Sequence, residues 1–305
     1  MLNEDVTRYV DLHRALGFKF RSQEGLLRNF VAFAEACGDD VVLAHRVLEW
    51  AAQAPSPPQR RNRLHNVRRF ALAMQAEDSR YEVPVADALG RGWFQRCHPY
   101  IYTPEEIARL IQAASQLAPA GSIRPLTYAT LFGLLTATGM RISEALALRL
   151  EDLTDDGLIV RETKFQKSRL LPLHETTRRA LDTYLSARLP VGKDDSALFV
   201  GNNGRAVPYD TVAGTFRRLS RAIGLRGDPG KPGPRIHDMR HTFAIRSLEQ
   251  CAQHRDAIAR HLVALSTYLG HAHVTDTYWY LEATPILMRQ IAEASEARLR
   301  EVGHD

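Results

Sequence analysis

The sequence has no long apolar run, few cysteines and very little lysine. No stretch approaches the roughly 18 consecutive apolar residues of a membrane helix, which argues against a membrane protein. The N-terminal segment MLNEDVTRYVDLHR is acidic and amphipathic and lacks the basic start and apolar run of a secretory signal, so we expect a cytoplasmic protein. The cysteines form no C-x-x-C pair, which argues against a disulfide framework and a cysteine zinc site; they are Cys37, Cys97 and Cys251.

Because lysine is scarce, arginine carries nearly all of the positive charge. The net charge is +5 and the isoelectric point is near 9.2, which weakly indicates a polyanionic partner. Arginine suits phosphate because its planar guanidinium offers two parallel hydrogen bonds, although a GC-rich genome would give the same bias. Lysine occurs only at Lys19, Lys164, Lys167, Lys193 and Lys231.

A length of 305 residues and a change of pattern near residue 90 predict two domains. Residues 1–88 read as helices only, including a third helix that Asp40 can cap and a proline-rich break at 54–58. Residues 89–102 lose periodicity and are the expected linker. The second domain, 103–305, then begins at Thr103-Pro104-Glu105-Glu106, which combines a capping box with proline at the first helical position.

The last helix of the first domain, expected over residues 59–76, is amphipathic and basic. One face is apolar, and another carries Arg61, His65, Arg68 and Arg69. Such a face is more often simply solvated, but an arginine stripe on a small helical domain also suits the DNA backbone. Arg61, Arg68 and Arg69 are therefore candidate DNA contacts.

The second domain is expected to be mainly α with a small β-sheet. Residues 158–160 and 169–173 flank a turn that holds Lys164 and Lys167, which predicts a hairpin. A lysine on such a ribbon can reach a DNA groove or deliver a proton to a leaving oxygen, although an exposed turn lysine is the common explanation. Helical patterns cover 104–115, 125–137, 143–151, 176–188, 209–223, 238–250 and 284–301.

Three further patterns in this domain carry chemistry. In the first, a glycine turn precedes Arg141 at the entrance of a short helix that Ser143 can cap. In the second, His237 and Arg240 flank the start of a helix that Asp238 can cap, so both can face one point. The third is the segment YLGHAHVTDTYWYL, residues 268–281, which contains L-G-H and two tyrosines.

Together these patterns resemble the tyrosine recombinases, also called the phage integrase family. Members share arginine in T-G-x-R-x-S-E, lysine in a hairpin, H-x-x-R, L-G-H, and tyrosine nine residues after that last histidine. The resemblance spans about residues 100–300, and the N-terminal part is more weakly similar to the family's helical core-binding domain. It implies a helical core-binding domain followed by a mixed α/β catalytic domain.

The resemblance also implies a role for each matching residue. Arg141 and Arg240 would clamp the phosphate, Lys164 would be the general acid, and His237 and His271 would be the site histidines. Tyr280 would be the nucleophile, giving a 3′-phosphotyrosine and a free 5′ hydroxyl without ATP or metal. Physical chemistry agrees, because attack on a phosphodiester builds negative charge that two arginines stabilise, and a tyrosine hydroxyl needs a base or a positive field.

Some assignments have rivals. Tyr278 competes with Tyr280, but residues two apart on a helix point to nearly opposite sides. Lys167 competes with Lys164, because Phe165 stands where the family commonly has glycine in K-G-x-K-x-R-x-x-P-L. The histidine pairs His237/His241 and His271/His273 have spacings seen in zinc sites, yet no matching carboxylate or cysteine signature accompanies them. His241 and His273 are expected to pack or to donate hydrogen bonds.

The interval from Arg240 to His271 looks longer than in Xer-like members. Residues 250–264 are therefore expected to form a surface extension, or to mark a subgroup similar to recombinases carried by transposons. The expected partners are double-stranded DNA, on the nucleoid, and further recombinase protomers in a tetrameric synapse, with partner recombinases as one option. The helix at 284–301 would pack on a neighbouring protomer or on its own domain. A type IB topoisomerase and a noncatalytic DNA-binding accessory protein are the alternatives.

Overall fold

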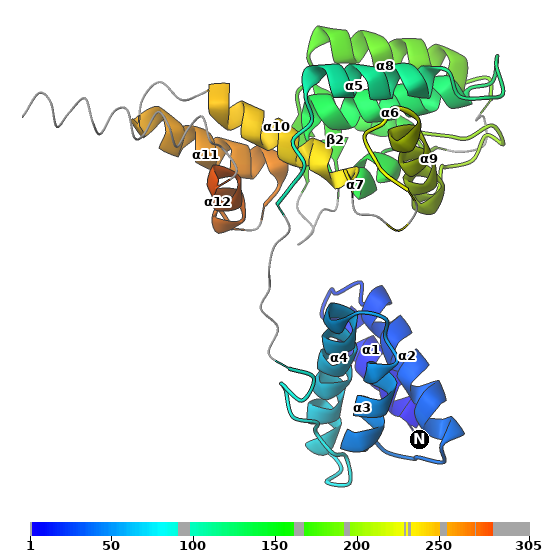
Figure 1. Ribbon diagram of the computed structural model, residues 1–305, viewed down its shortest axis with the longest axis vertical. Coiled ribbons are helices and arrows are strands. Elements are labelled where there is room, and N and C mark those ends of the chain that lie inside the picture. The colour runs from blue at the N-terminus through cyan, green and yellow to red at the C-terminus, as the bar shows by residue number, and fades with distance from the viewer. Residues whose placement is uncertain are drawn as a thin grey trace, which may run out of the picture. The chain divides into compact units, whose positions relative to one another are not determined.

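The chain divides into two compact units, Met1–Arg96 and Cys97–Asp305, and each is described here by itself. Figure 1 colours the first from blue to cyan and the second from green to orange. The computed structural model describes residues 2–90, 98–161, 168–191, 196–228, 230, 233–250, 255–271 and 273–282.

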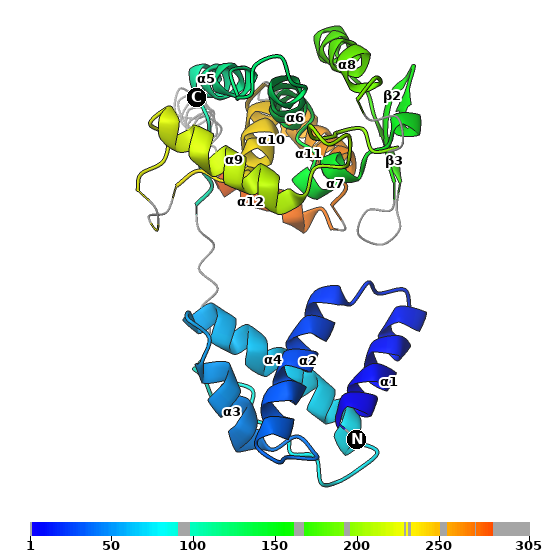
Figure 2. The same cartoon turned by 90° about the vertical axis from the view of Figure 1, so that its right-hand side faces the viewer.

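The N-terminal unit is a bundle of helices. Its described elements are α1 (Leu2–Ala15), α2 (Arg21–Ala36), α3 (Ala44–Ala52) and α4 (Pro57–Gln75) (Figure 2). Their apolar faces meet in one core that includes the fully buried Phe30, Trp50 and Phe70. Burial of these large side chains is the main stabilising contribution of the unit.

One expectation about helix ends in this unit is wrong and another is confirmed. Asp40 does not cap α3, because the helix begins only at Ala44, after Leu43. The proline-rich segment does separate two helices, since α3 ends at Ala52 and α4 begins at Pro57, two residues earlier than expected. Proline is tolerated in a first helical turn, where its missing N–H would have had no helical partner.

The C-terminal unit is mainly helical. The capping box at its first helix is present: Thr103 Oγ1 accepts the N–H of Glu106, and Glu106 Oε2 accepts the N–H of Thr103. The helices before the final group are α5 (Pro104–Ser115), α6 (Arg124–Thr138), α7 (Ile142–Ala147), η1 (Leu150–Asp152), α8 (Glu175–Arg188) and α9 (Tyr209–Ala222).

A small antiparallel sheet accompanies these helices, as the sequence predicts. Its order is β1 (Leu153–Thr154), β2 (Gly157–Val160) and β3 (Arg169–Leu171), and Leu158 pairs with Leu171. The sheet therefore contains the expected hairpin. The turn that holds Lys164 and Lys167 lies outside the described residues.

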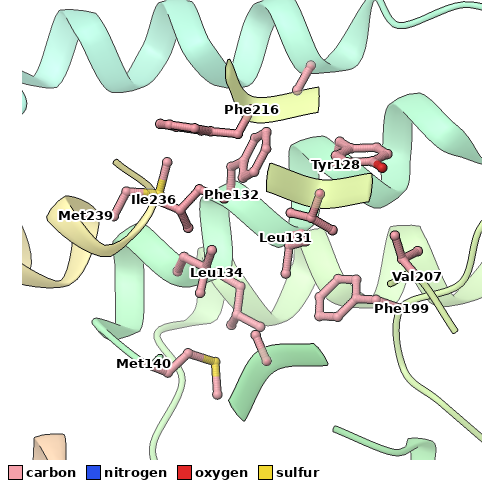
Figure 3. Packing of buried hydrophobic residues seen from close by; sticks show 14 of the residues in the cluster. Tyr128, Leu131, Phe132, Leu134, Met140, Phe199, Val207, Phe216, Ile236 and Met239 are labelled. Carbon is pink, nitrogen blue, oxygen red and sulfur yellow. The ribbon is translucent and has the colours of Figure 1, made fainter. Parts of the chain in front are cut away.

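The main core of this unit surrounds α6. Figure 3 shows Phe132 and Leu131 of α6 packed among Phe216 of α9, Phe199 and Met239. The core holds α6 rigidly, and the chain leaving α6 enters the candidate site. A smaller core joins three further helices, α10 (His237–Gln250), α11 (Arg255–Leu269) and α12 (Thr275–Glu282), which are grouped together in Figure 1.

Part of the expected surface extension at 250–264 lies in α11. This helix carries Leu262, Leu265 and Leu269, whose side chains are buried against α10 and α12. The C-terminal part of α11 is therefore packed into the fold and brings the L-G-H segment back to α10. No helix in the described ranges is long and apolar enough to cross a membrane. The helix expected at 284–301 lies outside those ranges.

Candidate active site

Arg141 stands at the junction between α6 and α7. Gly139 ends α6 with a φ of 60°, and a Cβ there would lie 2.4 Å from Cδ1 of Phe243, so glycine is required. Arg141 is the residue before α7, and its N–H donates to Glu144 Oε2 at 2.9 Å. The expected cap by Ser143 is wrong, because the helix begins at Ile142 and Ser143 lies inside its first turn.

Arg240 lies on α10 and is only 2% exposed. Its Nη1 donates to the carbonyl of Gly139 at 2.9 Å, and its Nη2 donates to the carbonyl of Leu269 at 2.7 Å. Burial and the nearby positive charge of Arg141 lower the pKa of Arg240 to about 10. Two backbone carbonyls thus hold a buried cation beside a second arginine, which favours an anionic ligand.

The start of α10 also differs from the expectation. His237 is the first residue of the helix instead of lying just outside it, and Asp238 lies in the first turn, where Oδ2 accepts the N–H of Arg235 at 2.8 Å. His237 and Arg240 are therefore three residues apart on one helix, a spacing that puts them on the same face.

His271 follows α11 and lies against Tyr280. Its Nδ1 shares a hydrogen bond of 2.7 Å with Oγ1 of Thr277, a residue with no exposed surface. The rings of His271 and Tyr280 are stacked, with centroids 6.0 Å apart and an angle of 20° between planes. Burial, with the positive charge of Arg240, lowers the pKa of His271 to about 4, so the ring is neutral at physiological pH.

The two rival tyrosines lie in different environments. Tyr280 is 3% exposed and belongs to the small core of α10, α11 and α12, whereas Tyr278 is 50% exposed. Burial raises the pKa of Tyr280, and the positive charges of Arg240 and Arg141 oppose that rise. Only Tyr280 is thus placed among the arginines and histidines that could activate a hydroxyl.

His241 is a residue of this site that its sequence pattern did not identify. Its ring lies 4.8 Å from that of His237 and 5.4 Å from that of Tyr280, measured between centroids. Burial and the neighbouring His237 lower the pKa of His241 to about 4, and its Nδ1 is buried without a hydrogen-bond partner. The i, i+4 spacing from His237 was the available signal, because it places both rings on one helix face.

Glu144 and Arg169 also belong to the site, although neither was a candidate in the sequence. Glu144 Oε1 accepts from Nη1 of Arg141 at 2.8 Å, and Oε2 accepts from Nη2 of Arg169 at 2.7 Å. Burial opposes ionisation of Glu144, but bonds from the two arginines hold its pKa below the usual value. Glu144 and Arg169 were visible in the R-x-S-E and K-x-x-K-x-R segments. The sequence could not show that they form an ion pair, because they lie 25 residues apart.

The site can therefore bind a phosphate and deliver a nucleophile to it. Two guanidinium groups supply charge-assisted hydrogen bonds, a buried tyrosine supplies the hydroxyl, and neutral imidazoles can accept its proton. The site contains Arg141, His237, Arg240, His271 and Tyr280, whereas Lys164 lies outside the described residues. Within the described ranges, no three His, Cys, Asp or Glu side chains gather as a metal-binding set.

The candidate DNA contacts of the N-terminal unit differ in their surroundings. Arg69 is exposed at the rim of a cavity of about 670 Å³ that Phe18 also lines. Arg61 is half-buried, and Arg68 donates from Nε to the carbonyl of Pro84 at 3.0 Å. Part of the Arg68 guanidinium is thus used to hold the segment after α4.

Comparison with known sequences gives one consistent set of relatives. The model of the phage integrase family matches residues 101–285. A Sinorhizobium fredii protein named as an integrase/recombinase is 40% identical over 306 residues, covering 96% of each chain. Tyrosine recombinase XerD of Caulobacter vibrioides is 33% identical over 281 residues, covering 88% of this chain and 82% of its own.

Solved structures share the fold at lower identity. A lambda integrase tetramer bound to a Holliday junction matches with a TM-score of 0.64 at 18% identity, covering 94% of this chain and 78% of the integrase. The XerH recombinase in a post-cleavage complex with its difH substrate matches with a TM-score of 0.63 at 19% identity, covering 88% and 77%. The mainly α fold with a small sheet is therefore confirmed.

Proposed function

The chain belongs to the phage integrase family of tyrosine recombinases, and we propose that it recombines DNA at specific sites through a covalent intermediate on Tyr280. The observation that carries the choice of residue is the burial of Tyr280 beside Arg240 and His271, in contrast to the half-exposed Tyr278. A nucleophile held in a positive, water-poor site can lose its proton at the moment of attack.

In the proposed reaction, the Tyr280 oxygen attacks the scissile phosphorus and its proton passes to a neutral imidazole, His237 or His241. Negative charge then builds on the nonbridging oxygens, where Arg141 and Arg240 stabilise it. The bond from phosphorus to the 5′ oxygen breaks, and that oxygen takes a proton from Lys164. The products are a 3′-phosphotyrosine and a free 5′ hydroxyl, so a hydroxyl of another strand can reverse the step without ATP or metal.

We further propose that the N-terminal unit is a core-binding domain and that both units contact duplex DNA. Its basic residues Arg61, Arg68 and Arg69, with Lys167 on the hairpin, would supply salt-dependent backbone affinity. Exchange between two duplexes requires four cleavages, and the structurally similar lambda integrase is a tetramer on a Holliday junction. We therefore expect a tetrameric synapse, either of this chain alone or with partner recombinases, acting on cytoplasmic DNA.

Trapping on a nicked suicide DNA substrate tests the proposal. Cleavage near the nick releases a short oligonucleotide, so the covalent adduct accumulates and can be mapped by peptide analysis. We expect an adduct with the wild type and with Tyr278→Phe, and none with Tyr280→Phe. Loss of the adduct with Tyr278→Phe alone would assign the nucleophile to Tyr278. If even the wild type formed no adduct on the true recombination site, a noncatalytic DNA-binding protein would be favoured. Relaxation of supercoils without strand exchange would favour a topoisomerase.

A further inference from the structure

Three successive backbone carbonyls at the C-terminal end of α11 each accept a hydrogen bond from a different arginine. Carbonyl groups at a helix end lack helical partners and carry partial negative charge, so they attract cations. The pairs are Arg169 Nε with Tyr268 at 2.8 Å, Arg240 Nη2 with Leu269 at 2.7 Å, and Arg141 Nη1 with Gly270 at 3.4 Å.

Arg169 is the member of this set to which the proposed mechanism gives no role. It belongs to β3, and its side chain is only 12% exposed. Besides the bond to Tyr268, its Nη2 and Nη1 donate to the two carboxylate oxygens of Glu144 at 2.7 and 3.3 Å. A bidentate bond of this kind fixes the orientation of both groups.

Glu144 transmits the effect of Arg169 to Arg141. Its Oε1 accepts from Arg141 Nη1 at 2.8 Å, so one buried carboxylate is shared by two guanidinium groups. With Arg169 present, the negative charge of Glu144 is balanced by two cations, and a net positive charge remains for the phosphate. Without Arg169, the carboxylate would pair with Arg141 alone and neutralise the group that must bind the nonbridging oxygens.

The backbone is shaped to admit the Arg169 side chain. Gly270 has a φ of 69°, and a Cβ at this position would lie 2.7 Å from Nη1 of Arg169. Glycine therefore permits both the left-handed conformation and the close approach of the guanidinium. Two features therefore require glycine in L-G-H: the close contact with Arg169 and the turn that precedes His271.

We propose that Arg169 is a positioning residue of the phosphate site, which acts through Glu144 to keep Arg141 oriented and charged toward the scissile phosphate. The inference rests on the proposed function. The same side chain ties β3, the strand that follows Lys164 in sequence, to the end of α11. Arg169 thus joins β3 to the two arginines of the site through Glu144 and the end of α11.

Single-turnover cleavage of the suicide substrate by Arg169→Met tests this role. We expect a loss of about 10- to 100-fold in the cleavage rate, the size typical of a misplaced charge-stabilising group. The loss should shrink to less than about threefold on a substrate with a neutral methylphosphonate at the scissile position, because a methyl group then replaces one charged nonbridging oxygen and Arg141 has less negative charge to stabilise. It should also shrink in an Arg141→Lys background, because coupled residues are not additive.

A purely structural role predicts a different pattern. The fold-loss of Arg169→Met would then be the same on the charged and neutral substrates and in both backgrounds, and this result would overturn the proposal. Arg169→Lys keeps the charge but cannot bond Glu144 and Tyr268 together, so we expect an intermediate rate. This milder variant decides the matter if Arg169→Met unfolds: equal losses on both substrates reject the role.

Arg161 offers a matched control. It follows β2 in the same hairpin and is ion-paired with Asp152 and Glu151, away from α11. Arg161→Met removes the same type of side chain from a more exposed position, 51% against 12%, and should keep the wild-type rate on both substrates. The proposed function and this inference fail in distinguishable ways: a wild type without any adduct refutes the former, whereas normal cleavage by Arg169→Met refutes the latter alone.

Discussion

The hydrogen bond between Thr277 and His271 offers a sharp test of how the site is built. Thr277 has no exposed surface, and its Oγ1 lies 2.7 Å from Nδ1 of His271. Thr277→Val keeps the shape of the side chain but replaces the hydroxyl with a methyl group. The half-buried imidazole then loses its partner, which costs about 1 to 3 kcal/mol of unfolding free energy.

The same substitution should slow DNA cleavage. The His271 ring is stacked on Tyr280, and the bond to Thr277 restrains the rotation of the ring. A small displacement of a group beside the nucleophile can cost up to about 100-fold in rate, so we expect a loss of 10- to 100-fold. Single-turnover cleavage of the suicide substrate gives the rate, and urea unfolding followed by circular dichroism gives the stability.

Two control variants separate the hydroxyl from other effects. Thr277→Ser keeps the hydroxyl and should retain the rate within about threefold, with stability lowered by the lost methyl group alone. Thr136→Val removes a hydroxyl that donates to the carbonyl of Phe132 on its own helix, and it should cleave normally. The reasoning is refuted if Thr277→Val cleaves at the wild-type rate, or if Thr277→Ser is as slow as the valine variant.

Three further predictions concern other parts of the molecule. Gly270→Ala should lower the unfolding free energy by about 1 to 2 kcal/mol from the left-handed backbone alone and slow cleavage by displacing Arg169, and the same two assays measure both effects. The pKa of His271 is about 4 in the folded protein and near 6.5 in the unfolded chain, so the unfolded chain binds more protons between these values. Stability should therefore fall as the pH drops from 6.5 toward 4, by about 1 to 2 kcal/mol at pH 5 after allowance for solvent screening, and His271→Gln should flatten the slope in urea titrations. Arg69→Ala should reduce the slope of log K against log salt for DNA binding by about 0.9, as expected for one lost phosphate contact, and an unchanged slope would show that Arg69 does not contact the backbone.

Local patterns predicted most of the secondary structure because their physics is local. The capping box at Thr103 and the proline after it specify the start of α5, and both hydrogen bonds of the box are present. The two short runs at 158–160 and 169–173 likewise predict a hairpin, and Leu158 and Leu171 are paired in the sheet. In each case the interacting residues are near one another in sequence, so the local pattern is enough to predict the element.

Failures occurred where tertiary contacts decide. A comparison of interval lengths suggested a surface extension at 250–264, but such a comparison says nothing of burial, and Leu262 within this interval packs against α10. Asp40 is a good capping residue by type, but α3 begins four residues later, at Ala44. Propensity is a weak prior that tertiary packing overrides.

In the candidate site too, the sequence predicts residues in local motifs but not the contacts between distant elements. A motif can nominate Arg141, Arg240 and His271, since each stands in a recognisable local segment. It cannot show that Arg169 shares Glu144 with Arg141, or that His241 faces Tyr280, because these contacts join separate elements of the fold. The roles of all these residues stay predictions until the variants are measured.

The end of α11 explains why the site needs the whole C-terminal unit. Its carbonyls bind arginines from β3, from α10 and from the turn after α6, so three elements are fixed relative to one another at a single helix end. A guanidinium held by carbonyls keeps its full charge, whereas one held by a carboxylate is neutralised. Arg240 is held by two carbonyls, and Arg141 shares the carboxylate of Glu144 with Arg169. Positive charge is therefore fixed in place but left uncancelled, which is the condition that stabilisation of a phosphoryl transition state requires.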